Sequence, residues 1–302
     1  MTGNFCIVLA ADTNYAPLLK GAVASLECLR GKVEFEIGIL DLGLRSEDID
    51  WLKGRGASIV LPDWDIDFPG VNKAPGYFKA MVSRPFLPKY FPDREVYLWM
   101  DSDGWLQDPD VLRLYVDVAR GGRLILASQI DRSYKGHFKR PKFFGWTHNH
   151  RSYRLGYGWR VADRYGRNPV LNSGFFAAPA TSPHWQLWAD SLAQGLQRTH
   201  DKLIEQTALN LMIYRDQPPV SVAPAYTNWL CDAATPGFEP KSGLLVEPNA
   251  PWQPLGFVHL AGDAAMGRTF KVEAVDQSKG VESRLDFDSW NAVRAPVRSD
   301  IC

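Results

Sequence analysis

The chain has 302 residues, of which 45% are hydrophobic, and 34 Lys and Arg residues balance 34 Asp and Glu residues. This length and apolar content are typical of a globular protein with one large or two small domains. A formal net charge of zero provides no overall field that attracts nucleic acid, so we expect no nucleic-acid partner.

The first half of the chain alternates strand and helix patterns. Apolar runs indicate strands, and apolar residues at helical spacing indicate helices between them. Strands are expected at residues 5–11, 33–40, 57–61, 96–100 and 123–128, and helices at 18–29, 46–53, 74–91 and 110–120. Pro85 and Pro88 are expected to break the third helix. This order predicts an α/β fold with a mostly parallel sheet and helices on both faces.

The second half of the chain has weaker patterns. A strand is expected at residues 170–178, helices at 183–196 and 202–215, and one further clear strand at 255–260. Residues 131–168 are aromatic and basic with weak periodicity, and the chain is rich in Pro and Gly from residue 223 onward. The C-terminal residues carry mixed charges, and the pattern places no element there.

Two carboxylates follow the strand expected at residues 96–100. Asp101 and Asp103 are two residues apart, so in an extended segment both side chains point to the same side. Oxygen ligands at the carboxyl edge of a sheet suit Mg²⁺ or Mn²⁺, and such an ion commonly holds phosphate. An ordinary turn is the alternative. An EF-hand loop is excluded because Leu106 and Leu112 occupy positions that need Gly and Glu.

Four further motifs accompany the aspartate pair in a characteristic order. They are Ala-Asp-Thr-Asn-Tyr after the first strand, Asn172-Ser173-Gly174, Glu205-Gln206, and His259-x-x-Gly262. Together the five motifs resemble those of the family 8 glycosyltransferases, which are retaining, metal-dependent enzymes that include galactosyl- and glucosyltransferases of bacterial lipopolysaccharide. The resemblance extends from about residue 5 to residue 262.

The resemblance implies a GT-A fold, a Rossmann-like and mostly parallel sheet with a smaller acceptor-side subregion. It implies one catalytic domain at residues 1–265, with a nucleotide-binding half at about 1–130 and an acceptor-side half at about 131–265. Residues 266–302 are then a C-terminal tail of unknown role. The implied function is transfer of a hexose from a uridine diphosphate (UDP) sugar, with UDP-galactose or UDP-glucose as donor, to a glycan or lipid-linked acceptor.

A metal site follows from the same resemblance. Asp101, Asp103 and His259 would bind the ion. A neutral imidazole beside two carboxylates suits Mn²⁺ better than Mg²⁺, which is the alternative ion. For His259 alone, the alternative role is a hydrogen-bonded histidine at a strand end.

The resemblance also assigns donor-binding residues. Asp12, Asn14 and Tyr15 would read the uridine, with Tyr15 stacked on the base. Their alternative role is to start a helix, since Asp, Thr and Asn cap helices well. Arg84 would lie over the donor, although a surface helix residue is the alternative. The remaining donor-binding residues are Ala10, Ser102, Gly174 and Gly262.

Three polar residues would surround the reacting sugar. Asn172 would line it together with Gly174, which allows close backbone approach. Glu205 replaces the usual aspartate of the family and would bind sugar hydroxyls, and Gln206 would lie beneath the anomeric carbon. Because an amide is a poor nucleophile, we expect front-face attack with Gln206 as a stabilising dipole. The alternative for this helix is simple amphipathic packing.

One position departs from the family pattern. Ala265 occupies the place of a lysine that steadies the leaving diphosphate, and Arg268 and Lys271 are nearby cations without matching spacing. This substitution keeps a second function open, namely a nucleotide-sugar-binding protein with weak or lost transferase activity. A nucleotidyltransferase is disfavoured because no Gly-rich, basic loop follows the first strand.

The segment that begins at Arg132 and ends at Arg167 is expected to bind the acceptor. It is rich in Lys, Arg and aromatic residues, with Asp163 as its only acid. Aromatic faces suit sugar rings and arginine forks suit anionic groups, which indicates an anionic glycan or glycolipid. A solvated basic loop region with some core aromatic residues is the alternative. Dispersed cysteines without a C-x-x-C pair predict no disulfides and a cytoplasmic protein, with peripheral contact at the inner face of a membrane.

Overall fold

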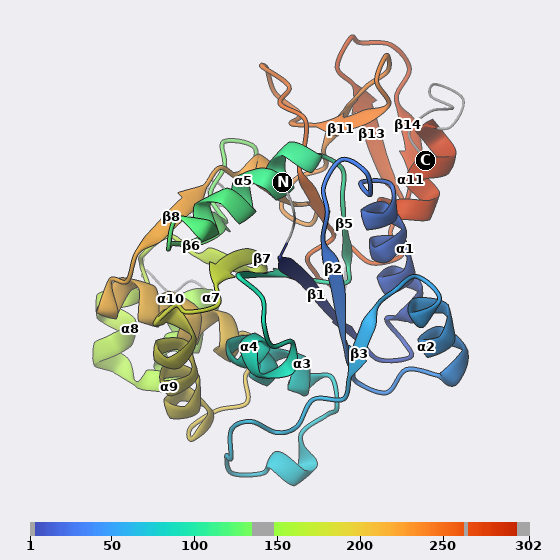
Figure 1. Cartoon of the computed structure of the whole chain (residues 1–302). Coiled ribbons are helices and arrows are strands. Elements are labelled where there is room, and N and C mark those ends of the chain that lie inside the picture. The colour runs from blue at the N-terminus through green and yellow to red at the C-terminus, as the bar shows by residue number, and fades with distance from the viewer. Residues whose placement is uncertain (1–3, 135–147, 263–264, 295–302) are drawn as a thin grey trace.

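A computed structural model describes residues 4–134, 148–262 and 265–294. Its centre is a seven-stranded sheet with strand order β3-β2-β1-β4-β7-β6-β8 (Figure 1). All neighbouring pairs are parallel except those of β7, which runs antiparallel to both β4 and β6. The strands are β1 (Phe5–Ala11), β2 (Glu36–Asp41), β3 (Ser58–Val60), β4 (Val96–Met100), β6 (Leu124–Ser128), β7 (Leu171–Pro179) and β8 (Val220–Ala223).

Helices cover both faces of this sheet. Alternate residues of each strand point to opposite faces, so Ile7 and Leu98 pack into one core, and Val8 and Trp99 into the other. The first core is covered by α1 (Ala16–Glu27), α2 (Ser46–Lys53) and α5 (Pro109–Arg120). The second is covered by η1 (Val71–Lys73), α3 (Phe78–Ser83), η2 (Arg84–Phe86), α4 (Leu87–Tyr90), α7 (His148–Tyr157), α8 (Trp159–Tyr165), α9 (His184–Leu196) and α10 (Ile204–Asp216). The predicted α/β fold with a mostly parallel sheet is confirmed.

The C-terminal part of the chain adds two small sheets and a third core. Their elements are β5 (Gly104–Leu106), η3 (Ala225–Thr227), β9 (Asn228–Leu230), β10 (Gly237–Glu239), β11 (Leu244–Val246), β12 (Phe257–His259), β13 (Phe270–Ala274), β14 (Val281–Ser283) and α11 (Phe287–Arg294). Trp105, Trp229 and Trp290 are buried together in this core. The strand expected at residues 255–260 is confirmed as β12. The other strands after residue 223 were not expected, because strands this short carry too few residues for a periodic signal.

The cysteines differ from expectation. Cys6 and Cys231 are buried free thiols, whereas Cys28 is disulfide-bonded. The expectation of a chain without disulfides is wrong, so cysteine usage no longer argues for a reducing compartment.

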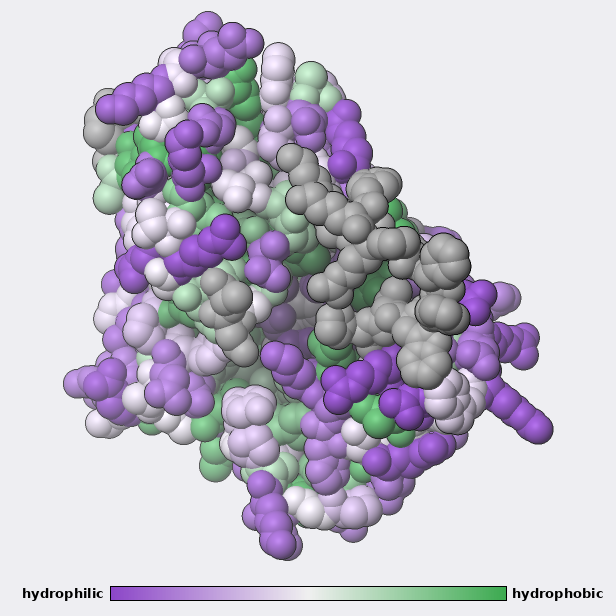
Figure 2. All heavy atoms as spheres, turned by 180° about the vertical axis from the view of Figure 1, so that it is seen from behind, coloured by the Kyte–Doolittle hydropathy of each residue, from purple (hydrophilic) through white to green (hydrophobic). Residues whose placement is uncertain are grey.

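The surface is that of an ordinary globular protein. Hydrophilic residues predominate on the face turned toward the viewer in Figure 2, and apolar residues lie between them in small groups. Within the described ranges, no helix combines the length and apolarity needed to cross a bilayer.

Candidate functional site

Three side chains from separate parts of the sequence meet at the carboxyl end of β4. Asp101 follows the last residue of this strand, and Asp103 immediately precedes β5. Because β12 pairs with β5 with His259 opposite Gly104, the imidazole is brought beside the aspartates. His259 Nε2 lies 3.3 Å from Asp103 Oδ1 and 3.7 Å from Asp101 Oδ2. One ligand atom from each residue lies within 4.8 Å of the others, so the structure unites the predicted metal ligands.

Hydrogen bonds to neighbouring residues orient His259 and Asp101 so that His259 Nε2 and Asp101 Oδ2 face one another. Asn228 donates its amide hydrogen to Asn172 Oδ1 at 2.9 Å, so Asn228 Oδ1 is an acceptor for His259 Nδ1 at 3.0 Å. With Nδ1 as donor, Nε2 is the ring nitrogen that faces the carboxylates and is left to bind an ion, as in many metal sites. Asp101 Oδ1 accepts from Trp99 Nε1 at 2.7 Å, which leaves Oδ2 toward His259. This mixed imidazole and carboxylate donor set fits Mn²⁺.

The electrostatics of the cluster favour an added positive charge. Burial lowers the pKa of His259, but the Asp103 carboxylate outweighs burial and raises it above its ordinary value. Burial likewise raises the pKa of Asp103, and His259 reverses the shift to a net lowering. Both shifts have the same cause, an excess of negative charge that a proton on the imidazole partly offsets.

Gly174 is enclosed by these ligands. Since β7 is antiparallel to β4, its first residues lie at the edge where β4 ends, and Asp101 N–H donates to Gly174 O at 2.7 Å. A Cβ at this position would lie 2.4 Å from His259 Cε1 and 2.5 Å from Asp101 Oδ2. Only glycine therefore fits here without displacing the ligands.

A buried ion pair adjoins the cluster. Arg84 Nη1 lies 2.7 Å from Glu205 Oε2 and 2.9 Å from Ser173 Oγ, while Nη2 lies 2.6 Å from Asp101 Oδ1. Arg84 is only 8% exposed, which excludes the alternative of a surface helix residue. Burial raises the pKa of Glu205 to about 7 despite the guanidinium. Glu205 Oε1 and Arg84 Nε are buried and have no hydrogen-bond partner among the described residues.

Gln206 lies one residue further along α10 and is half-buried. Its Oε1 accepts from Ser173 N–H at 3.2 Å and from Gln129 Nε2 at 3.3 Å. Asn172 Oδ1 also accepts from Gly174 N–H at 2.8 Å. The three residues predicted to surround the sugar therefore lie close to one another at the start of β7 and α10.

The loop after β1 is connected to the same edge. Ser102 Oγ donates to Ala10 O at 2.7 Å. Asp12 Oδ1 accepts from the backbone N–H groups of Asn14 and Tyr15 at 2.9 and 3.1 Å, directly before α1 begins. Asp12 therefore stabilises the turn before α1 but does not cap the helix, whose N-cap is Tyr15 without a side-chain hydrogen bond. Its contact with a base stays a prediction.

The two cations near Ala265 contact residues outside the cluster. Ala265 is buried, and its N–H donates to the carbonyl of Gly262 at 3.0 Å. The guanidinium of Arg268 lies 4.8 Å from the centre of the Phe270 ring, and exposed Lys271 pairs with Glu273 at 2.8 Å.

The predicted acceptor segment is only partly available. Tyr134, Tyr153 and Tyr157 are buried in the cores, so the expectation that they face a sugar is wrong. Trp159 is 51% exposed, with the Arg154 guanidinium 5.0 Å from its ring centre. The predicted members Lys135, Phe138, Lys139, Arg140, Lys142, Phe143, Phe144 and Trp146 lie outside the described residues.

Two residues of the site were missed in the sequence. Asn228 orients His259, but nothing in its sequence surroundings marks it, because β9 meets β12 only in the folded chain. Trp99 donates to Asp101 and could have been found, since it lies two residues earlier on the same side of the chain.

Comparison with known proteins extends the fold assignment. No protein-family model and no curated protein matches this sequence. Among solved structures, the bifunctional glycosyltransferase WbbM has a TM-score of 0.54 at 13% identity, covering 87% of this chain and 46% of WbbM. The galactosyltransferase LgtC, solved with donor and acceptor sugar analogs, has a TM-score of 0.48 at 18% identity, covering 74% and 75% of the two chains. Mouse xyloside xylosyltransferase 1 has 0.46 at 14% identity, covering 77% and 90%.

These identities establish the fold alone, and of the three structures WbbM has a likeness close enough to support it. This chain spans less than half of WbbM. The chain therefore has the fold of GT-A glycosyltransferases, as the sequence predicted. Membership of family 8 stays a prediction.

Proposed function

We propose that the protein is a metal-dependent, retaining glycosyltransferase of family 8 that transfers a hexose from UDP-galactose or UDP-glucose to a glycan or lipid-linked acceptor. The observation that carries this proposal is the cluster of Asp101, Asp103 and His259 at the end of β4, on a glycosyltransferase fold. The adjacent Arg84–Glu205 pair adds groups suited to a sugar. The proposed ion is Mn²⁺.

The proposed reaction divides its work among the residues of the site. When bound, the ion would act as a Lewis acid that offsets the negative charge of the leaving diphosphate. Asn228 would keep His259 Nε2 turned to that ion, and Arg84 would hold Asp101 through Oδ1. These contacts would fix the ligands before the donor arrives, which reduces reorganisation during the reaction.

The sugar would lie against α10 and the start of β7. Glu205 Oε1 is a buried acceptor without a partner in the described residues, and a sugar hydroxyl would satisfy it. Gln206 is held by Ser173 and Gln129, so its amide dipole would have a fixed direction beneath an oxocarbenium-like anomeric centre. Attack from the front face, guided by the departing phosphate, would retain configuration without a protein nucleophile.

Calorimetric titration tests this proposal. UDP, UDP-galactose and UDP-glucose are titrated into the protein with and without Mn²⁺, and then into the Asp103→Ala variant. We expect Mn²⁺-dependent binding that the variant weakens at least about tenfold, since a metal ligand is lost. Asp117→Ala is the matched control, because it removes an exposed carboxylate from α5 and should change nothing. Absence of binding by any uridine compound would contradict the proposal.

The second candidate is a nucleotide-sugar-binding protein with weak or lost turnover. Burial of Ala265 where a cation was expected favours it. Product formation separates the two functions: release of UDP from UDP-hexose in the presence of glycan acceptors indicates a transferase. Tight, Mn²⁺-dependent binding without any release of UDP indicates the binding protein.

A further inference from the structure

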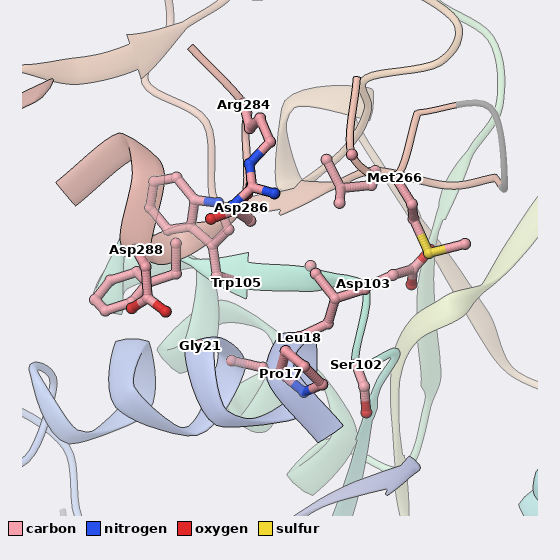
Figure 3. Close-up of a pocket in the computed structure, with 15 residues that line it drawn as sticks. Pro17, Leu18, Gly21, Ser102, Asp103, Trp105, Met266, Arg284, Asp286 and Asp288 are labelled. Carbon is pink, nitrogen blue, oxygen red and sulfur yellow. The ribbon is translucent and has the colours of Figure 1, made fainter. Parts of the chain in front are cut away.

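A cavity of about 260 Å³ lies beside Asp103, between α1 and the C-terminal segment (Figure 3). Leu18 and Gly21 of α1 form one wall, and Met266 and Arg284 belong to the opposite side. Neither Asp101 nor His259 lines it, so the cavity extends away from the metal cluster with Asp103 as the shared residue.

Arg284 is held through Nε, so its two terminal nitrogens can contact a ligand. Its Nε lies 3.1 Å from Asp286 Oδ2 and 3.3 Å from Ser289 Oγ. Neither terminal nitrogen donates a hydrogen bond to another residue in the described part of the chain. Figure 3 shows the guanidinium beside Asp286, turned toward the interior of the cavity. A guanidinium fixed through Nε presents its two terminal nitrogens as a fork, a geometry that matches phosphate oxygens.

The other charged residues that line the cavity do not engage the two terminal nitrogens of Arg284. Asp286 is already engaged, because Oδ1 accepts from Ser289 N–H at 3.0 Å and Oδ2 faces Arg284. Asp288 is exposed to solvent. Pro17 and Leu18 belong to the first turn of α1, the end of a helix that favours anions. The remaining acid, Asp103, belongs to the cluster that would hold a divalent cation.

We propose that Arg284 binds the diphosphate of the nucleotide donor through its two terminal nitrogens. This inference rests on the proposed function and deepens it, since it adds a donor-binding residue from the C-terminal segment. A diphosphate chelated to an ion at Asp103 would reach the arginine across the shared cavity. The negative charge of the donor would then be met by the ion on one side and by the guanidinium on the other.

The test compares ligands that differ only in phosphate. UDP, UMP and uridine are titrated by calorimetry into the wild-type chain and into Arg284→Ala and Arg284→Lys, all with Mn²⁺. We expect Arg284→Ala to weaken UDP binding about ten- to hundredfold and uridine binding less than about twofold, since only charge-assisted hydrogen bonds are lost. Arg284→Lys should be intermediate, because it keeps the charge and loses the fork.

Arg268→Ala is the matched control. It removes the same charge from an exposed position of the same segment, outside the cavity, and should leave UDP affinity unchanged. Thermal unfolding of each variant verifies that the fold is intact. Equal UDP affinity of wild type and Arg284→Ala would overturn the inference alone. Equal losses for UDP and uridine would also overturn it, because Arg284 would then act on the nucleoside or on the fold. Failure of the wild type to bind UDP would overturn the proposed function, and the inference with it.

Discussion

The two halves of the candidate site differ in how far the protein buries and neutralises their carboxylates. On the Glu205 side, the carboxylate and the guanidinium of Arg84 are 4% and 9% exposed and lie 2.7 Å apart. On the metal-ligand side, the side chains of Asp101 and Asp103 are 24% and 14% exposed, and Arg84 reaches only Asp101. One guanidinium thus contacts two of the three carboxylates, those of Glu205 and Asp101. The buried charge is neutralised within the protein, and the excess negative charge remains at the accessible end, where a cation can bind.

Removal of the Arg84 guanidinium, which the two halves of the site share, should have the largest of the expected effects. Arg84→Met leaves buried Glu205 with the Ser173 hydroxyl but without a cation, and breaking a buried pair in this way costs about 3–5 kcal/mol in the free energy of unfolding. Denaturant unfolding at pH 8 measures it, because Glu205 is then largely ionised. Arg84→Lys should lose less because it keeps the positive charge, but it should not match wild type, since one ammonium cannot replace both arms of the fork. A loss below about 1 kcal/mol would show that the pair does not stabilise the folded chain.

The pH dependence of the free energy of unfolding tests the raised pKa of Glu205. Burial raises the pKa of this carboxyl from 4.5 to about 7, so between these values the folded chain keeps a proton that the unfolded chain releases. Its contribution to the free energy of unfolding therefore falls as pH rises through this window. Glu205→Gln cannot titrate and should lose less stability between pH 5 and pH 8, by up to about 3 kcal/mol. Parallel pH profiles of wild type and variant would contradict a raised pKa.

A smaller effect is expected on the metal-ligand side. Asn228→Ala removes the acceptor that orients His259, and loss of such a partner typically lowers metal affinity about 10- to 100-fold. Calorimetric titration with Mn²⁺ measures the change. Asn228→Asp keeps an acceptor for His259 Nδ1 but loses the donor to Asn172, so it should retain more affinity than the alanine variant. Equal affinity in all three proteins would mean that the orientation of His259 does not depend on residue 228.

The predictable part of the fold is the part with long, continuous patterns. The apolar runs that become β1 and β4 locate the centre of the sheet, and Pro85 does interrupt the helical segment, since α3 ends at Ser83. The antiparallel direction of β7 could not be predicted, because alternation is the same in either direction. Apart from β12, which was expected, the short strands from β9 to β14 lack a detectable period, so the C-terminal core built around Trp229 and Trp290 was missed.

In the candidate site, too, local sequence patterns predict some features, whereas others depend on contacts that form only in the folded chain. Asp101 and Asp103 are only two residues apart in the sequence, so their proximity could be predicted from local geometry. The position of His259 beside them depends on the pairing of β12 with β5, and that pairing was available only through resemblance to a family. The burial of Tyr153 and Tyr157 depends on how α7 packs, and the weak periodicity of this segment did not predict it.

The pairing of β5 with β12 has a consequence for how an ion would enter and leave. Asp103 and His259 are attached to adjacent, hydrogen-bonded strands, so their separation is set by the backbone ladder before any ion is present. In a zinc finger, by contrast, the ion must also supply the free energy that folds its loop. Here the free energy of coordination is not spent on ordering the chain. An ion bound in the proposed function could therefore exchange with solvent while the strands that carry Asp103 and His259 stay paired.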